Sequence, residues 1–228
     1  VLVLTNIYPA YDDLYRNAFV HQRVKGYKEQ GLNVDVMCFN NVNPVGYREF
    51  DGIDVVTGFT KELEAILKTG NIDTVCVHFL NEYMWDVLKN FKDKIRIIIW
   101  CHGSEIQPWW RRKFLYENDQ DLEKAKIQSD HRMALWNEVF DAVKESNIHF
   151  VFVSDYFKQS IEEDYKIRFS DEDYSIIHNY INTELFDYVP KNAEQRKNIL
   201  SIRPFGSNVY ANDLTVKCIK ELSSKDYF

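Results

Sequence analysis

Glycine and proline are scarce in this chain, which has 8 glycines and 5 prolines among its 228 residues. No Gly-x-Gly-x-x-Gly fingerprint occurs, and neither a Walker phosphate loop nor a Gly-x-Ser-x-Gly elbow is present. These absences argue against a classical NAD or FAD enzyme, against P-loop chemistry and against a serine hydrolase. The six histidines include no pair at metal-ligand spacing, so we expect no metal centre.

Cysteines and long apolar runs are also limited. Cys38, Cys76, Cys101 and Cys218 lie far apart, and three of them fall within predicted strands. We therefore expect reduced thiols in the core rather than a metal or redox site. The longest apolar run, around residues 95–101, is too short to span a bilayer.

Acidic residues outnumber basic ones, 35 to 28, which gives a formal net charge of -7 and a pI near 5.4. This charge opposes nucleic-acid binding and gives no bulk attraction to anionic lipid. No secretory signal opens the chain. We therefore expect a cytoplasmic protein that does not bind nucleic acid.

Short β-branched runs alternate with helical patterns along the sequence. This alternation is typical of an α/β fold with a Rossmann-like parallel sheet and flanking helices. Thr60 and Ser154 are expected to cap the helices that follow them, and Asp51-Gly52 predicts an antiparallel hairpin over residues 47–58. The predicted strands are residues 1–5, 33–39, 73–79, 96–101, 149–153, 174–178 and 198–202, and the predicted helical stripes are residues 20–27, 63–67, 84–91, 133–143 and 157–165.

The pattern changes after His178, where a polar stretch precedes a further strand and helix. We expect residues 1–180 to form the first Rossmann-like domain and residues 181–197 to form an interdomain linker. Residues 198–228 would then be the first strand-helix unit of a second domain, which is too short to fold alone. We expect the rest of this second domain to be either missing from the sequence or contributed from elsewhere.

Ligands of open parallel sheets bind beyond the carboxyl ends of the strands. The loop of residues 6–17, which contains Tyr8 and Arg16, follows the first predicted strand. His102 ends another strand, where its imidazole can donate a hydrogen bond to a sugar hydroxyl or a phosphate. A strand-end histidine bonded to a neighbouring carbonyl is the alternative interpretation.

Two further loops combine aromatic or basic residues. Trp109 and Arg111 can stack a sugar ring, hold a diphosphate or contact a membrane interface, and the alternative is packed tryptophans beside a solvated basic turn. Arg203 and Gly206 follow the strand predicted at residues 198–202, where an arginine is well placed for a diphosphate. An exposed arginine without a ligand is the alternative there.

Taken in order, these segments resemble glycosyltransferase family 4, whose members are retaining enzymes of the GT-B fold. Residues 7–9, 19–24 and 31–36 are similar to the first βαβ unit of that family, and residues 102–105 are similar to its histidine loop. Residues 176–186 resemble its interdomain Asn-Gly-Ile-Asp segment. Residues 198–204 resemble the strand that opens its donor domain.

The resemblance implies a GT-B acceptor domain followed by a truncated start of a second Rossmann-like domain. It places His102 at the reaction centre, with no metal and no cofactor, because the nucleotide sugar is a substrate. Arg203, Gly206 and Asn179 would bind the donor. The acceptor side would comprise Tyr8, Arg16, Gly103, Ser104, Glu105, Trp109 and Arg111.

The implied function is retaining hexosyl transfer from a nucleotide-sugar donor to a glycan or lipid-linked acceptor in polysaccharide biosynthesis. Such an acceptor would bring peripheral contact with the inner face of the membrane. The chain ends before the paired glutamates of the family's donor domain, so we expect this chain alone to be inactive. The alternatives are a nucleotide-sugar epimerase of the same fold and a non-catalytic module that binds a sugar or a partner.

Overall fold

The computed structural model describes residues 1–42, 44–143, 146–179, 181–183, 186–194, 199–201 and 208–225. The chain divides into two compact units. The first comprises Val1–Pro108 and Lys126–Tyr180, and the second comprises Trp109–Ala125 and Ile181–Phe228. The predicted division into a first domain, a linker and the start of a second domain remains a prediction.

The first unit is built on an eight-stranded open sheet with the order β3-β4-β2-β1-β5-β6-β7-β8. All neighbouring strands are parallel except the pair β3 and β4. The α/β class is therefore confirmed, and the sheet is consistent with a Rossmann-like fold. The strands are β1 (Leu2–Thr5), β2 (Asp35–Phe39), β3 (Gly46–Phe50), β4 (Ile53–Gly58), β5 (Thr74–His78), β6 (Arg96–Cys101), β7 (Ile148–Phe152) and β8 (Tyr174–Ile176).

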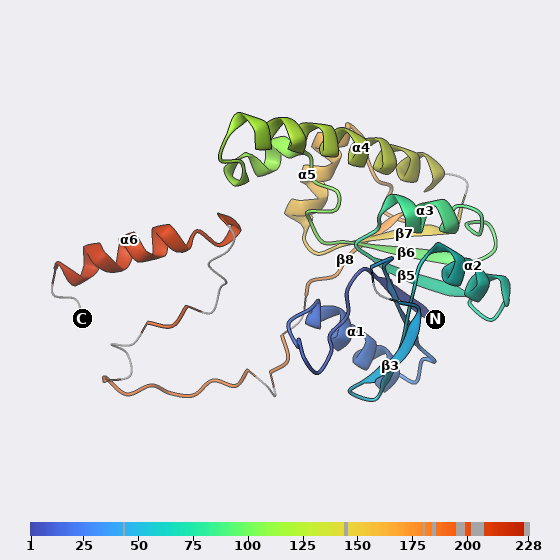
Figure 1. Ribbon diagram of the computed structural model, residues 1–228, viewed down its shortest axis with the longest axis horizontal. Coiled ribbons are helices and arrows are strands. Elements are labelled where there is room, and N and C mark those ends of the chain that lie inside the picture. The colour runs from blue at the N-terminus through green and yellow to red at the C-terminus, as the bar shows by residue number, and fades with distance from the viewer. Residues whose placement is uncertain are drawn as a thin grey trace. The chain divides into compact units, whose positions relative to one another are not determined.

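Helices cover both faces of this sheet (Figure 1). Successive side chains of a strand point to opposite faces, so Leu2 and Leu4 join one apolar cluster and Val3 joins the other. Helix α1 packs Val20 and Val24 on the face of Val3, whereas the other face is covered by four helices. These are α2 (Thr60–Lys68), α3 (Glu82–Leu88), α5 (Asp155–Tyr165) and the part of α4 (Asp119–Val143) from residue 126 on, and α1 spans Ala18–Glu29.

The predicted caps had different outcomes. Ser154 accepts a hydrogen bond from the backbone N–H of Phe157 at 3.2 Å, as predicted for the start of α5. The prediction for Thr60 was wrong, because Thr60 is the first helical residue of α2 and Phe59 holds the cap position. There the carboxylate of Glu62 accepts the backbone N–H of Phe59 at 2.9 Å, and the side chain at the cap position accepts no helix N–H.

The predicted hairpin is confirmed. Strands β3 and β4 pair antiparallel, with Phe50 opposite Ile53. Asp51 and Gly52 form the turn with φ of 50° and 73°, the two positive values that a type I′ turn requires. The hairpin forms one end of the sheet, beyond β2.

The second unit contains short helical segments and α6 (Asn212–Ser223), which is the helix predicted after the linker. The 3₁₀ segments among its described residues are η1 (Trp109–Leu115) and η3 (Asn208–Tyr210). Of the strand predicted at residues 198–202, residues 199–201 are described and form no strand, and the other two lie outside the described residues. The described part of this unit offers no other strand with which they could pair.

All four cysteines have free thiols, and Cys38, Cys76 and Cys101 are buried while Cys218 is exposed. Burial raises the pKa of the Cys76 thiol to about 11. Across the described ranges, no helix is both long and apolar enough to cross a membrane.

Gly58, the last residue of β4, packs closely against α2. A Cβ atom at this position would lie 2.7 Å from Cβ of Glu62 and 3.2 Å from the Met37 methyl carbon. We expect Gly58→Ala to lower the free energy of unfolding by roughly 1–3 kcal/mol, because an overpacked core must shift its backbone. Urea denaturation monitored by circular dichroism measures this difference.

Gly26→Ala is the matched control, because a Cβ atom at Gly26 within α1 meets no atom within 4 Å. This variant should be neutral or more stable by up to about 1 kcal/mol, since alanine favours helices. Equal losses of stability in the two variants would contradict the close packing of β4 and α2.

Candidate functional site

Two histidines meet at the carboxyl edge of the sheet. His78 is the last residue of β5, and His102 directly follows β6. Because β5 and β6 are adjacent and parallel, their ends lie side by side, and Nδ1 of His78 is 2.9 Å from Nε2 of His102. His102 was predicted from the sequence, and His78 was not. The signal that could have found His78 is its place at the carboxyl end of a predicted strand.

Aromatic rings surround His102. The ring of Phe79 lies 4.7 Å from the His102 ring at an interplanar angle of 27°, and Phe19 of α1 contacts it edge-on at 5.0 Å. The His78 and His102 rings are nearly parallel, with an angle of 18°. The His102 ring is therefore packed against other rings and remains partly exposed at the edge of the sheet.

Burial and a nearby cation keep both imidazoles neutral. Burial, aided by the positive charge of Arg23, lowers the pKa of His102 to about 3. Burial also lowers the pKa of His78 far below its usual value, and the neighbouring His102 and Arg23 add to this effect. At neutral pH the pair consists of two neutral rings that share one hydrogen bond.

Arg23 of α1 connects this region to the segment after β8. Its guanidinium carbon lies 3.8 Å from the centre of the Trp100 ring, in a cation–π contact. Its Nη2 donates to Oδ1 of Asn179 at 2.9 Å and to the carbonyl oxygen of His178 at 3.3 Å. Asn179, a predicted donor-binding residue, is exposed and is oriented by this arginine.

Glu105 holds the loop that follows His102. Its carboxylate accepts the backbone N–H groups of His102 and Gly103, with Oε2 at 2.9 Å from the Gly103 nitrogen. Gly103 has φ of +148°, a conformation that L side chains rarely adopt. Ser104 is exposed. Three predicted acceptor-side residues therefore share one loop, in which the Glu105 charge is used to bind backbone groups.

Buried side chains from two helices also hold this loop, through hydrogen bonds to its backbone carbonyl oxygens. Nε1 of Trp136 in α4 donates to the carbonyl oxygen of Glu105 at 2.7 Å. The hydroxyl of Tyr165 in α5 donates to the carbonyl oxygen of Ile106 at 2.7 Å. Such anchoring leaves little freedom to the backbone next to His102.

A second part of the carboxyl edge contains a pocket of about 390 Å³. Tyr8 and Arg16, which the sequence analysis placed on the acceptor side, both line it. The guanidinium of Arg16 pairs with Asp13 at 2.7 Å, and that of Arg48 donates to the carbonyl oxygens of Tyr8 and Pro9. The pocket volume falls within the range of small-molecule sites.

The Tyr8 side chain is buried, with 1% of its surface exposed. Its hydroxyl lies 2.8 Å from Nδ1 of His21, whose Nε2 lies 3.0 Å from Oδ2 of Asp51. Burial raises the pKa of the Tyr8 hydroxyl. Tyr8 therefore ties the first loop to α1 and to the hairpin turn, and its hydroxyl is engaged within the protein.

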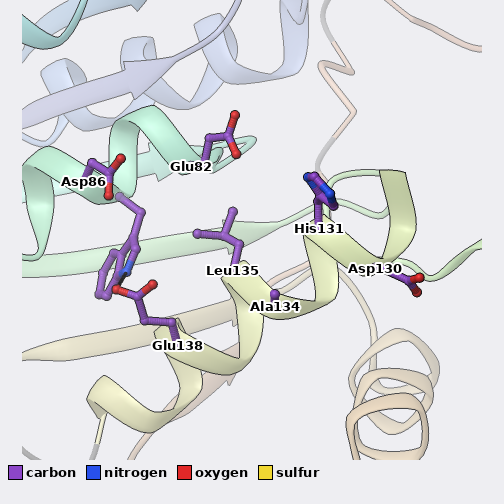
Figure 2. Close-up of a pocket in the computed structure, with 8 residues that line it drawn as sticks. Glu82, Asp86, Asp130, His131, Ala134, Leu135 and Glu138 are labelled. Carbon is purple, nitrogen blue, oxygen red and sulfur yellow. Dashed lines mark hydrogen bonds between the residues drawn. The ribbon is translucent and has the colours of Figure 1, made fainter. Parts of the chain in front are cut away.

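A larger groove of about 490 Å³ runs between α3 and α4 (Figure 2). Glu82 and Asp86 of α3 face His131 and Glu138 of α4 across it. None of the residues predicted for the site lines this groove. The described ranges contain no cluster of three or more histidine, cysteine or carboxylate side chains that could hold a metal ion.

The remaining predicted residues lie elsewhere. Trp109 and Arg111 belong to η1 in the second unit, where Nζ of Lys113 lies 5.2 Å from the centre of the Trp109 ring. Arg203 and Gly206 lie outside the described residues. The structure thus places the His102 loop and the pocket of Tyr8 and Arg16 at two different parts of the carboxyl edge.

No protein-family model matches this chain, and no curated protein is significantly similar to it.

The neutral state of His102 can be tested by nuclear magnetic resonance. Because its pKa is lowered to about 3, its ring should gain no proton between about pH 8 and about pH 5, whereas an N-acetylhistidine standard titrates near 6.5. The unfolded chain does bind that proton. Stability should therefore fall as pH drops from about 6.5 toward 3.

The ring nitrogen shifts of ¹⁵N-histidine-labelled protein follow this titration directly, and the standard is dissolved in the same sample. A midpoint near 6.5 for His102 would show that burial and Arg23 do not control its charge.

Proposed function

We propose that this chain is the acceptor-side part of a retaining glycosyltransferase of the GT-B fold, acting on a nucleotide-sugar donor and a glycan or lipid-linked acceptor in polysaccharide biosynthesis. The observation that carries the proposal is the neutral His102 at the carboxyl edge of an open parallel sheet. The resemblance of residues 102–105 and 176–186 to glycosyltransferase family 4 supports it.

A neutral imidazole suits this chemistry. The acceptor hydroxyl oxygen forms a bond to the anomeric carbon on the face from which the nucleotide diphosphate leaves, and the departing diphosphate oxygen takes the hydroxyl proton. His102 donates a hydrogen bond to an oxygen of the donor sugar or diphosphate without adding charge. Its aromatic and buried surroundings strengthen such a bond, because water competes poorly there.

Charge on the leaving group needs separate stabilisation. In this proposal Arg203 and Gly206 contact the diphosphate, and Asn179, oriented by Arg23, contributes a polar group from the segment between the domains. These assignments follow from the resemblance. The same arrangement requires no metal ion and no cofactor.

The acceptor is assigned to the pocket near Tyr8 and Arg16. Tyr11 and Tyr15, from the same loop, are each 70% exposed and offer flat rings to a sugar. Ser104 of the His102 loop is exposed as well and can contact the acceptor. Trp109 and Arg111 are the proposed contacts for a lipid-linked or membrane-bound part of the acceptor.

The test is a transfer assay on the protein expressed from its natural gene, with radiolabelled UDP-glucose, UDP-N-acetylglucosamine and GDP-mannose supplied in turn with membranes of the source cells. His102→Ala should reduce the rate of transfer by roughly 100-fold or more, as expected when a preorganised donor is removed from a charge-developing site. Binding of the free nucleotide diphosphate should change by less than about threefold, a difference of under about 0.7 kcal/mol.

His131→Ala is the matched control, because His131 lines the groove between α3 and α4, which His102 does not line. It should transfer sugar at the rate of the unmodified protein. Unchanged transfer by His102→Ala would refute the proposed role of this residue. Epimerised nucleotide sugar without transfer would favour an epimerase, and binding without turnover of any donor would favour a non-catalytic module.

A further inference from the structure

The bond between His78 and His102 leaves one question open, which is where its proton resides. Two neutral imidazoles joined at 2.9 Å share one N–H group. If His78 donates from Nδ1, then Nε2 of His78 is bare and His102 carries its proton on Nδ1. If His102 donates from Nε2, then His78 carries its proton on Nε2 and Nδ1 of His102 is bare.

The surroundings of His78 distinguish these arrangements. His78 is fully buried, and its Nε2 has no hydrogen-bond partner among the described residues. A proton on that nitrogen would be a buried donor without an acceptor, which folded proteins rarely contain. A bare nitrogen lone pair near the positive charge of Arg23 is the less costly choice.

The opposite side of His102 is available to a ligand. Within the described part of the chain, Nε2 of His102 bonds to His78, and Nδ1 of His102 has no protein partner. Because His102 is partly exposed at the carboxyl edge, a group on Nδ1 can meet an oxygen atom of a bound molecule.

We propose that His78 is a positioning residue that donates Nδ1–H to Nε2 of His102 and thereby fixes His102 as the Nδ1–H tautomer, a hydrogen-bond donor of set direction. The ligand that this donor meets is an oxygen acceptor, a sugar hydroxyl or a phosphate. That last assignment rests on the proposed function, whereas the tautomer does not.

The experiment is long-range ¹H–¹⁵N correlation spectroscopy on the ¹⁵N-histidine-labelled 228-residue chain at neutral pH, which shows which ring nitrogen of each histidine carries the proton. In the unmodified chain, His78 and His102 should both be Nδ1–H tautomers. His78→Asn places an amide nitrogen where Nδ1 stood, so His102 should keep its tautomer.

His149→Phe is the control, because His149 bonds to Ser175 on the neighbouring β8 and contacts neither histidine of the pair. It should leave the His102 signals unchanged. An Nε2–H tautomer of His102 in the unmodified chain would overturn the proposal, even if His78→Asn fails to fold. A shift of His102 to the Nε2–H tautomer in a folded His78→Asn chain would also overturn it. Because no ligand is added, an absence of sugar transfer in the separate assay leaves this result unaffected.

Discussion

Parallel pairing of β1, β5 and β6 is the constraint on which the rest of the structure depends. Thr5 of β1 is paired with His78 of β5, and His78 is paired with Trp100 of β6. This register ends all three strands at one edge, so the first loop, His78 and His102 are presented together. Burial of both faces of the sheet holds the register. A slip by one residue would move every side chain of a strand to the opposite face and so disrupt both apolar clusters.

The same packing sets the charge state of the two histidines at this edge. Burial and Arg23 act in one direction on His78 and His102, so both rings stay neutral and act through hydrogen bonds. The one carboxylate in the loop, Glu105, is occupied by backbone N–H groups. In the proposed function, this site orients oxygen atoms of the substrates, and the negative charge of the leaving diphosphate is met by other residues. The assignment of that charge to Arg203 follows from the resemblance.

Much of the fold could be predicted from local patterns. Phe157, Ile161 and Tyr165 behind Ser154 predicted α5, and Asp51-Gly52 predicted the hairpin, because both signals act over a few residues. The site was predicted less completely. His78 lies in an apolar strand and is significant only through its contact with a residue 24 positions away.

Other features of the site depend on tertiary contacts that no local pattern reveals. Tyr8, a predicted acceptor-side residue, lines the pocket, and the contacts of its ring with His21 and Phe50 could not be predicted from the loop sequence. Glu105 was predicted as an acceptor-side residue, and its use as an anchor for backbone groups depends on the turn at Gly103. Arg203 and Gly206 lie outside the described residues, and their part in donor binding remains a prediction.

The most direct measurement is a crystal structure of the protein expressed from its natural gene, bound to a nucleotide sugar. We expect an oxygen of the donor sugar or diphosphate within about 3.2 Å of Nδ1 of His102, with the bond between Nε2 and His78 intact. A nucleotide sugar bound away from the carboxyl edge, or a His102 ring whose Nδ1 meets only protein groups in that complex, would contradict it.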